Sequence, residues 1–87
     1  MQLDDYRKRI DEVDDKLISL LEQRMGISCE IAEFKARENI PTVDEGREKV
    51  KLFEVANKTG NPLYKEHMKK IFEAVMEQSR SLQDELR

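Results

Sequence analysis

Two cations of this 87-residue chain occupy positions where the surrounding pattern calls for apolar side chains. Arg24 falls in a hydrophobic seam between Leu20 and Ile27, and Lys35 follows Arg24 by 11 residues. At about 100° per residue, 11 residues of helix return to within about 20° of the starting direction. Both cations should therefore point into the interior of a helical bundle. Because an unpaired cation is costly to bury, we expect an anion to meet them there.

Further polar groups interrupt the apolar faces of the two later segments. Ser79 occupies a core position of the C-terminal segment, and Gln83 lies one turn later on the same face. In the middle segment Asp44 and Glu48 are one turn apart, with Arg47 beside Glu48. One such residue alone is more often structural, paired with a carboxylate or bonded to a helical carbonyl. Together they indicate a polar pocket with a cationic lining, suited to a small anion of multiple charge.

Arg7 does not fit into the same pocket as Arg24 of its own chain. The two residues are 17 positions apart. In a helix this separates them by about 25 Å along the axis and rotates them by about 100°. A small ligand cannot reach both. From the residues alone Arg7 is interpreted as a surface charge, unless it joins the pocket of a second chain.

The two buried cations require a long helix to carry them. Apolar residues recur with gaps of three and four from Leu3 to Phe34, which predicts one helix from about Leu3 to Glu38. Such a helix is about 54 Å long, whereas a compact domain of this size has a radius of gyration of about 12 Å. Two short helices cannot cover that stripe. We therefore expect a homodimer formed through the long helix.

Two shorter helices should follow the long one. Residues 39–41, Asn-Ile-Pro, break the first helix. Thr42 followed by Glu45 has the capping-box pattern, which predicts a second helix from Thr42 to about Asn57. Pro62 is well placed at the opening of a third helix. The predicted fold is all-α, with a long, a short and a medium helix in a single domain spanning residues 1–87.

Composition and charge exclude several functional classes. Charged residues are 40% of the chain and aromatic residues 6%, which suits solvated helices better than a β-sandwich. The 16 basic and 19 acidic residues leave a net charge of -3, without the basic excess of a general nucleic-acid surface. No segment approaches the roughly 20 apolar residues of a membrane span, and the charged N-terminus excludes a signal peptide. We expect a cytoplasmic protein with neither nucleic-acid nor membrane partners.

Metal and nucleophilic chemistry are also excluded. His67 is the only histidine and has no metal partners at ligand spacing. Cys29 is the only cysteine, so neither an intrachain disulfide nor a cysteine metal cluster can form. No histidine lies near Cys29 in sequence to activate its thiol. We expect no cofactor and no metal.

Over nearly its whole length the sequence resembles the AroQ-type, all-helical chorismate mutases. Each matching stretch is weak by itself, but their order and spacing over three helices are specific, and the polar residues above form the family's active-site set. The matching stretches are residues 6–11, 13–17, 20–24, 31–35, 44–48 and 72–79, followed by Gln83.

The resemblance implies an isomerase that converts chorismate to prephenate in phenylalanine and tyrosine biosynthesis. The reaction is an intramolecular Claisen rearrangement of a small dianion and requires neither cofactor nor metal. The resemblance also implies an intertwined homodimer with two active sites. Each site would use three helices of one chain and Arg7 of the other.

The resemblance also implies the role of each site residue. Arg7 of the partner subunit and Arg24 would hold the substrate's carboxylates, supported by Arg47. Lys35 would serve both a carboxylate and the ether oxygen, to which Gln83 would also donate. Glu48, together with the backbone near Asp44, would bind the ring hydroxyl of the substrate. Ser79 would form a hydrogen bond with a carboxylate.

Two alternatives remain open at this point. Isochorismate pyruvate lyase has a similar fold and keeps the cations, but Glu48 and Ser79 favour the mutase. A non-catalytic helical dimerisation module is the second alternative. It leaves four polar residues unexplained inside the bundle, namely Arg24, Lys35, Ser79 and Gln83.

Overall fold

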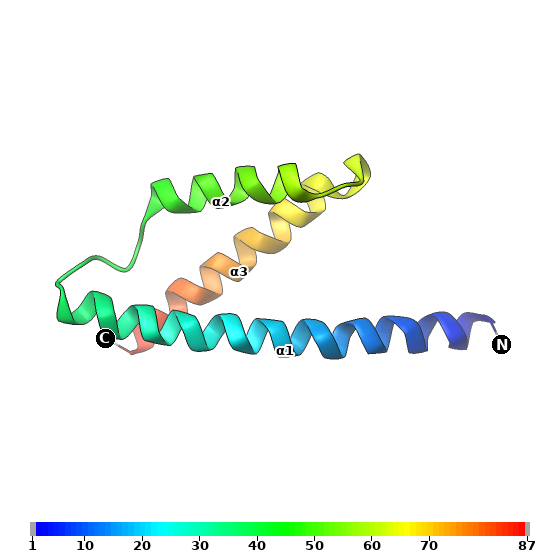
Figure 1. Cartoon of the computed structure of the whole chain (residues 1–87), viewed down its shortest axis with the longest axis horizontal. Coiled ribbons are helices and arrows are strands. Elements are labelled where there is room, and N and C mark those ends of the chain that lie inside the picture. The colour runs from blue at the N-terminus through cyan, green and yellow to red at the C-terminus, as the bar shows by residue number, and fades with distance from the viewer. Residues whose placement is uncertain (1, 87) are drawn as a thin grey trace.

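The computed structural model describes residues 2–86, which form three α-helices and one short 3-10 turn (Figure 1). The elements are α1 (Gln2–Arg37), α2 (Glu45–Lys58), η1 (Pro62–Tyr64) and α3 (Lys65–Glu85). In Figure 1, α2 runs back antiparallel to α1 and α3 crosses obliquely between their two lines. The predicted all-α fold with a long, a short and a medium helix is confirmed.

Helix α1 sets the dimensions of the molecule. Its 36 residues correspond to about 54 Å at 1.5 Å per residue, close to the longest extent of the chain, 55 Å. The radius of gyration is 16.0 Å, against about 12 Å for a compact domain of this length. The N-terminal half of α1 accounts for the difference, because its residues are exposed and its end projects past the other helices (Figure 1).

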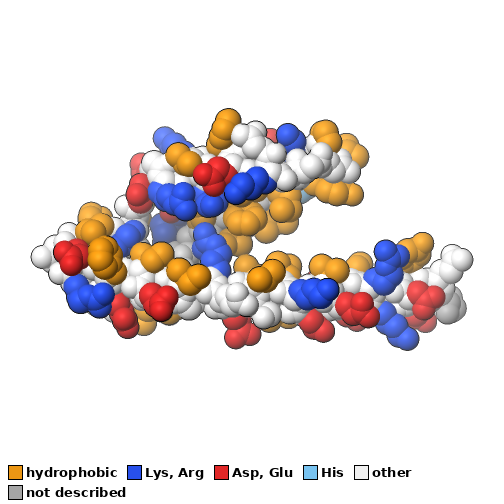
Figure 2. All heavy atoms as spheres, in the orientation of Figure 1, with side chains coloured by type: hydrophobic (Ala, Val, Ile, Leu, Met, Phe, Trp, Pro, Cys, Tyr) orange, Lys and Arg blue, Asp and Glu red, His pale blue; other side chains and the backbone are white. Residues whose placement is uncertain are grey.

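Very little of the chain is buried. Among the described residues the buried hydrophobic side chains are Ala32, Val55 and Met76. Every residue from Gln2 to Leu20 is exposed. Apolar side chains line the edge of α1 that faces the side of the molecule where α2 lies (Figure 2). We call these residues the α1 stripe, and each of them is between 50% and 62% exposed. The α1 stripe consists of Leu3, Tyr6, Ile10, Val13, Leu17 and Leu20. A continuous apolar surface of this kind favours association with another chain.

Helix α3 holds the other two helices apart. It packs against both α1 and α2, whereas α1 and α2 do not approach each other closely anywhere in residues 2–86. A space therefore remains between α1 and α2, bounded on one side by α3.

The chain reverses after α1 through a residue in the left-handed conformation. Asn39 has a φ of 55°, a region that asparagine tolerates better than most residues. The backbone N–H of Ile40 then donates to the carbonyl of Lys35 at 2.8 Å, and that of Glu38 donates to Phe34 at 3.0 Å. These bonds satisfy two of the last four carbonyls of α1. The predicted break at residues 39–41 is confirmed.

The predicted start of the second helix at Thr42 is wrong. Helix α2 begins at Glu45, and Asp44 is its N-cap, since the Asp44 carboxylate accepts from the backbone N–H of Arg47 at 3.0 Å. A carboxylate at this position also interacts favourably with the helix dipole. Thr42 has a different partner, because its carbonyl accepts from Lys35 Nζ at 2.9 Å. The loop before α2 is thereby tied to α1.

Replacing Asp44 with alanine should lower the free energy of unfolding by about 1 kcal/mol, because the cap of α2 is lost. Asp44→Asn is the matched control, since the asparagine side chain still accepts from the Arg47 N–H. The measurement is urea unfolding of both variants at one protein concentration. Equal stability of the alanine and asparagine variants would contradict the assigned cap.

Pro62, predicted at the opening of the third helix, opens the short η1 turn instead, and α3 itself begins three residues later, at Lys65. Asn61 caps the η1 turn, its side chain accepting from the backbone N–H of Leu63 at 2.9 Å. Pro62 stands at the first position, where its missing N–H costs nothing. Helix α3 continues from Lys65 and turns one face toward the space between α1 and α2.

Candidate active site

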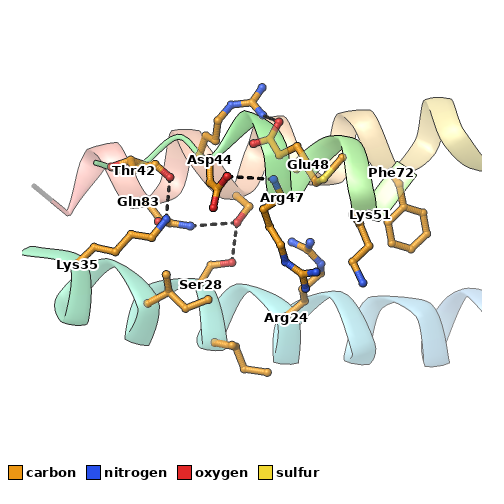
Figure 3. A pocket seen from close by; sticks show the side chains of 15 residues that line it. Arg24, Ser28, Lys35, Thr42, Asp44, Arg47, Glu48, Lys51, Phe72 and Gln83 are labelled. Atoms are coloured by element: carbon orange, nitrogen blue, oxygen red, sulfur yellow. Dashed lines mark hydrogen bonds and ion pairs between the residues drawn. The ribbon is translucent and has the colours of Figure 1, made fainter. Parts of the chain in front are cut away.

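A cavity of about 360 Å³ lies between the three helices. Figure 3 looks into it, with α1 below and α2 above. Seven of the eight predicted site residues line this cavity, and they are Arg24, Lys35, Asp44, Arg47, Glu48, Ser79 and Gln83. Their roles in catalysis remain predictions.

Two guanidinium groups face the cavity without an anionic partner. Arg24 comes from α1 and Arg47 from α2, and their side chains point toward one another (Figure 3). Neither side chain forms an ion pair or a hydrogen bond with any residue in the described range. Like charges repel at such positions, and the repulsion falls when an anion lies between them. The pair therefore favours binding of a carboxylate or similar group.

Lys35 is held at the end of the cavity by the loop before α2. Its ammonium donates to the carbonyl of Thr42 at 2.9 Å, and the side chain is half-buried. A neutral carbonyl fixes the position of the ammonium but does not neutralise its charge. Lys35 therefore keeps a full positive charge available to a ligand.

Glu48 is fixed by a residue that the sequence analysis missed. Arg80 of α3 forms an ion pair with Glu48 of α2 through Nη1 and Oε1, and both line the cavity. The two side chains are only 31% and 26% exposed, so solvent screens this pair less than a surface pair. The ion pair orients the Glu48 carboxylate and links α2 to α3 across the cavity wall.

Lys51 is a further cavity cation that the sequence analysis missed. It lies one turn beyond Glu48 on α2 and points into the space between α1 and α2 (Figure 3). Its ammonium is 3.1 Å from Glu54 Oε2. This hydrogen bond and the charge of Lys51 lower the pKa of Glu54 below its ordinary value of 4.5. At neutral pH the Glu54 carboxylate is ionised and offsets part of the Lys51 charge.

Three polar side chains form a hydrogen-bonded chain between α1 and α3. Ser28 Oγ is 2.7 Å from Ser79 Oγ, and Gln83 Nε2 donates to Ser79 Oγ at 3.4 Å (Figure 3). Gln83 is 6% exposed, and its Oε1 is buried without a hydrogen-bond partner in residues 2–86. Ser28 was not among the predicted site residues, although it lies four residues after Arg24 on the same helix face.

The charges around the cavity differ in sign from the chain as a whole. The cavity walls carry two carboxylates, those of Asp44 and Glu48, and five cations. These five cations are Arg24, Lys35, Arg47, Lys51 and Arg80. Apolar side chains complete the lining, from Ile27, Ile31, Phe72 and Met76. Such a cavity suits a compact organic molecule that carries more than one negative charge.

Comparison with known proteins identifies the family. Residues 6–84 match the family of type II chorismate mutases. This chain belongs to that family. A chorismate mutase from Methanocaldococcus jannaschii is 34% identical over 88 residues, which cover 94% of this chain and 84% of the relative. No solved structure matches the chain at a significant level.

As a type II chorismate mutase the protein is an isomerase, and the predicted family and enzyme class are confirmed. Neither comparison favours a lyase or a non-catalytic module. The match extends over α1, α2 and α3, and so includes every residue that lines the cavity.

Arg7 is the one predicted site residue of this chorismate mutase that lies outside the cavity. It is exposed on the projecting half of α1. The straight course of α1 keeps it about 25 Å from Arg24 along the axis. Arg7 cannot reach the cavity of its own chain, and its entry into a partner's cavity stays a prediction.

In residues 2–86 no group of three or more histidine, cysteine, aspartate or glutamate side chains is arranged to hold a metal ion. No helix in this range combines the length and the hydropathy needed to cross a bilayer.

Proposed function

We propose that this protein rearranges chorismate to prephenate in active sites shared between two chains, as a step of aromatic amino-acid biosynthesis. The observation that carries the proposal is the cavity between the helices. It combines the unpaired cations Arg24 and Arg47 with the ammonium of Lys35. Its volume, about 360 Å³, lies within the range of small-molecule sites. Chorismate is a compact dianion that fits this lining.

The first task of such a site is to hold the substrate in its reactive folded conformer. The rearrangement is intramolecular, so no nucleophile or proton shuttle is required, and positioning is a large part of the catalysis. Arg24 and Arg7 of the partner subunit hold the two carboxylates, and Arg47 supports them. Guanidinium groups suit this role because they bind carboxylates in a bidentate manner.

The second task is to stabilise negative charge on the ether oxygen as the C–O bond breaks. Fixed donors in a dry site contribute most to this kind of stabilisation. Lys35 supplies a full charge and Gln83 a neutral N–H donor. The burial of Gln83, which is 6% exposed, supports a site from which water is excluded.

The remaining polar residues recognise the rest of the substrate. Glu48, oriented by its ion pair with Arg80, accepts from the ring hydroxyl together with the backbone near Asp44. Ser79 donates to a carboxylate. These contacts distinguish chorismate from other dianions of similar size.

The shared site requires a homodimer. The α1 stripe, exposed by at least half at each position, supports dimerisation through α1. The projecting half of α1 then brings Arg7 into the partner's cavity. Two features support this entry, namely the gap between α1 and α2 and the buried Oε1 of Gln83, which has no hydrogen-bond partner in residues 2–86. The free thiol of Cys29 accords with the reducing cytoplasm that we propose as the compartment.

Incubation of the purified protein with chorismate tests this proposal. We expect rapid loss of chorismate absorbance and prephenate as the product identified by NMR. Isochorismate, supplied separately, should release no pyruvate. Pyruvate release from isochorismate, or a folded dimer that leaves chorismate unchanged, would contradict the proposed reaction.

A further inference from the structure

Ser28 is the most deeply buried polar side chain near the site that no role above includes. It is 3% exposed and lies on α1 between Arg24 and Lys35. Its Oγ is 2.7 Å from Ser79 Oγ on α3, so the two hydroxyls bond across the interface between the helices. A buried hydroxyl is costly unless it is hydrogen-bonded, and here its partner is a residue of the cavity wall.

The hydrogen-bonding capacity of Ser79 decides what this contact does. A serine hydroxyl has one proton to donate and two lone pairs that accept. Gln83 Nε2 already donates to Ser79 Oγ, at 3.4 Å. If Ser28 donates as well, both lone pairs of Ser79 are occupied and its single proton must point elsewhere. If instead Ser79 donates to Ser28, no proton remains for a ligand.

We propose that Ser28 is a positioning residue that donates to Ser79 and thereby directs the Ser79 proton toward the anion in the cavity. The inference rests on the proposed function, in which Ser79 binds a substrate carboxylate. An O–H group that faces a carboxylate forms a strong, charge-assisted hydrogen bond. Donation from Ser28 polarises Ser79 in the same direction, since successive hydrogen bonds in a chain strengthen one another.

The chain Ser28–Ser79–Gln83 also orients the Gln83 amide. Donation from Nε2 to Ser79 directs one N–H of Gln83 back to the preceding turn of α3. The second N–H of the same nitrogen then remains for the ether oxygen of the substrate. Ser28 thus supports both neighbours without contacting the reacting atoms.

A purely structural role makes a different prediction. A helical serine often bonds a carbonyl of the preceding turn of its own helix, and its removal then affects stability alone. In this structure the bond of Ser28 goes to Ser79. A positioning role therefore predicts altered substrate binding, in addition to any stability lost with the bond between the helices.

Ser28→Ala is the primary test, because alanine is the best helix former and adds no volume. We expect unchanged helicity by circular dichroism, and a KM for chorismate raised about tenfold with a smaller change in kcat. The matched control is Ser81→Ala, on an exposed position of α3, which should keep both constants at wild-type values. An unchanged KM in Ser28→Ala would overturn the inference.

A double-mutant cycle separates this role from an independent contribution. The double variant Ser28→Ala, Ser79→Ala should have the same KM as Ser79→Ala alone, because Ser28 acts only through Ser79. Ser28→Thr retains the hydroxyl and should restore most of the affinity. Additive effects in the cycle would contradict the inference even if the threonine variant fails to fold. Absence of chorismate turnover in the wild type would instead remove the proposed function itself.

Discussion

Replacing Lys35 with alanine is expected to lower kcat about a thousandfold, because a preorganised charge that meets the developing oxyanion is lost. The structure holds this ammonium at the cavity through the carbonyl of Thr42, 2.9 Å away. Water cannot replace it at the same position without reorganising. The effect should fall mainly on kcat, since charge on the ether oxygen grows only in the transition state.

Two further variants make the Lys35 result interpretable. Lys35→Met keeps the length of the side chain without its charge and should be as inactive as the alanine variant. Lys49→Ala removes an exposed cation of α2 that does not line the cavity, and should keep wild-type kinetics. All three should give the circular dichroism spectrum of the wild type. Substantial turnover by the Met variant would remove Lys35 from its assigned role.

Replacing Arg7 with alanine is expected to lower kcat/KM about a hundredfold, although Arg7 lies far from the cavity of its own chain. The loss follows if the guanidinium binds a substrate carboxylate in the partner's site. Truncating one side of such a desolvated pair leaves the other charge without compensation. Steady-state kinetics with chorismate measure the effect directly.

Lys8→Ala is the matched control for Arg7, because it removes a neighbouring exposed cation of the same helix. It should leave kcat/KM unchanged. Both variants should sediment as the wild type does, since neither residue belongs to the α1 stripe. Wild-type kinetics in Arg7→Ala would mean that Arg7 is an ordinary surface charge and that each site is complete within one chain.

The helices could be predicted where a single pattern dominated the local sequence. The alternating gaps from Leu3 to Phe34 are interrupted only at Arg24, so the predicted ends of α1 differ from the observed ones by one residue. The start of α2 had two competing caps. Thr42 with Glu45 satisfies the capping-box spacing, but Asp44 forms the stronger cap and Thr42 is engaged by Lys35.

Four of the predicted site residues share one recognisable feature, namely a polar side chain at an apolar position. Arg24, Lys35, Ser79 and Gln83 interrupt hydrophobic stripes, and all four line the cavity. Arg7 has no such signal, and only the resemblance to a family suggested it.

The missed residues depend on distances between helices, which a periodic pattern does not contain. Arg80 and Lys51 resemble ordinary surface charges in sequence, and their relation to the cavity depends on how α2 and α3 cross. Ser28 is small enough to be overlooked in a bundle, and its significance comes from the hydroxyl of Ser79 on another helix. Such pairs become visible only once the helices are packed.

The most direct test of a site shared between two chains is to mix two inactive variants. Arg7→Ala and Lys35→Ala chains form heterodimers in which one site has both residues intact and the other has neither. Random exchange makes half of the dimers heterodimers, so we predict recovery of about one quarter of wild-type activity. No recovery, with subunit exchange verified by native mass spectrometry, would contradict the shared active site.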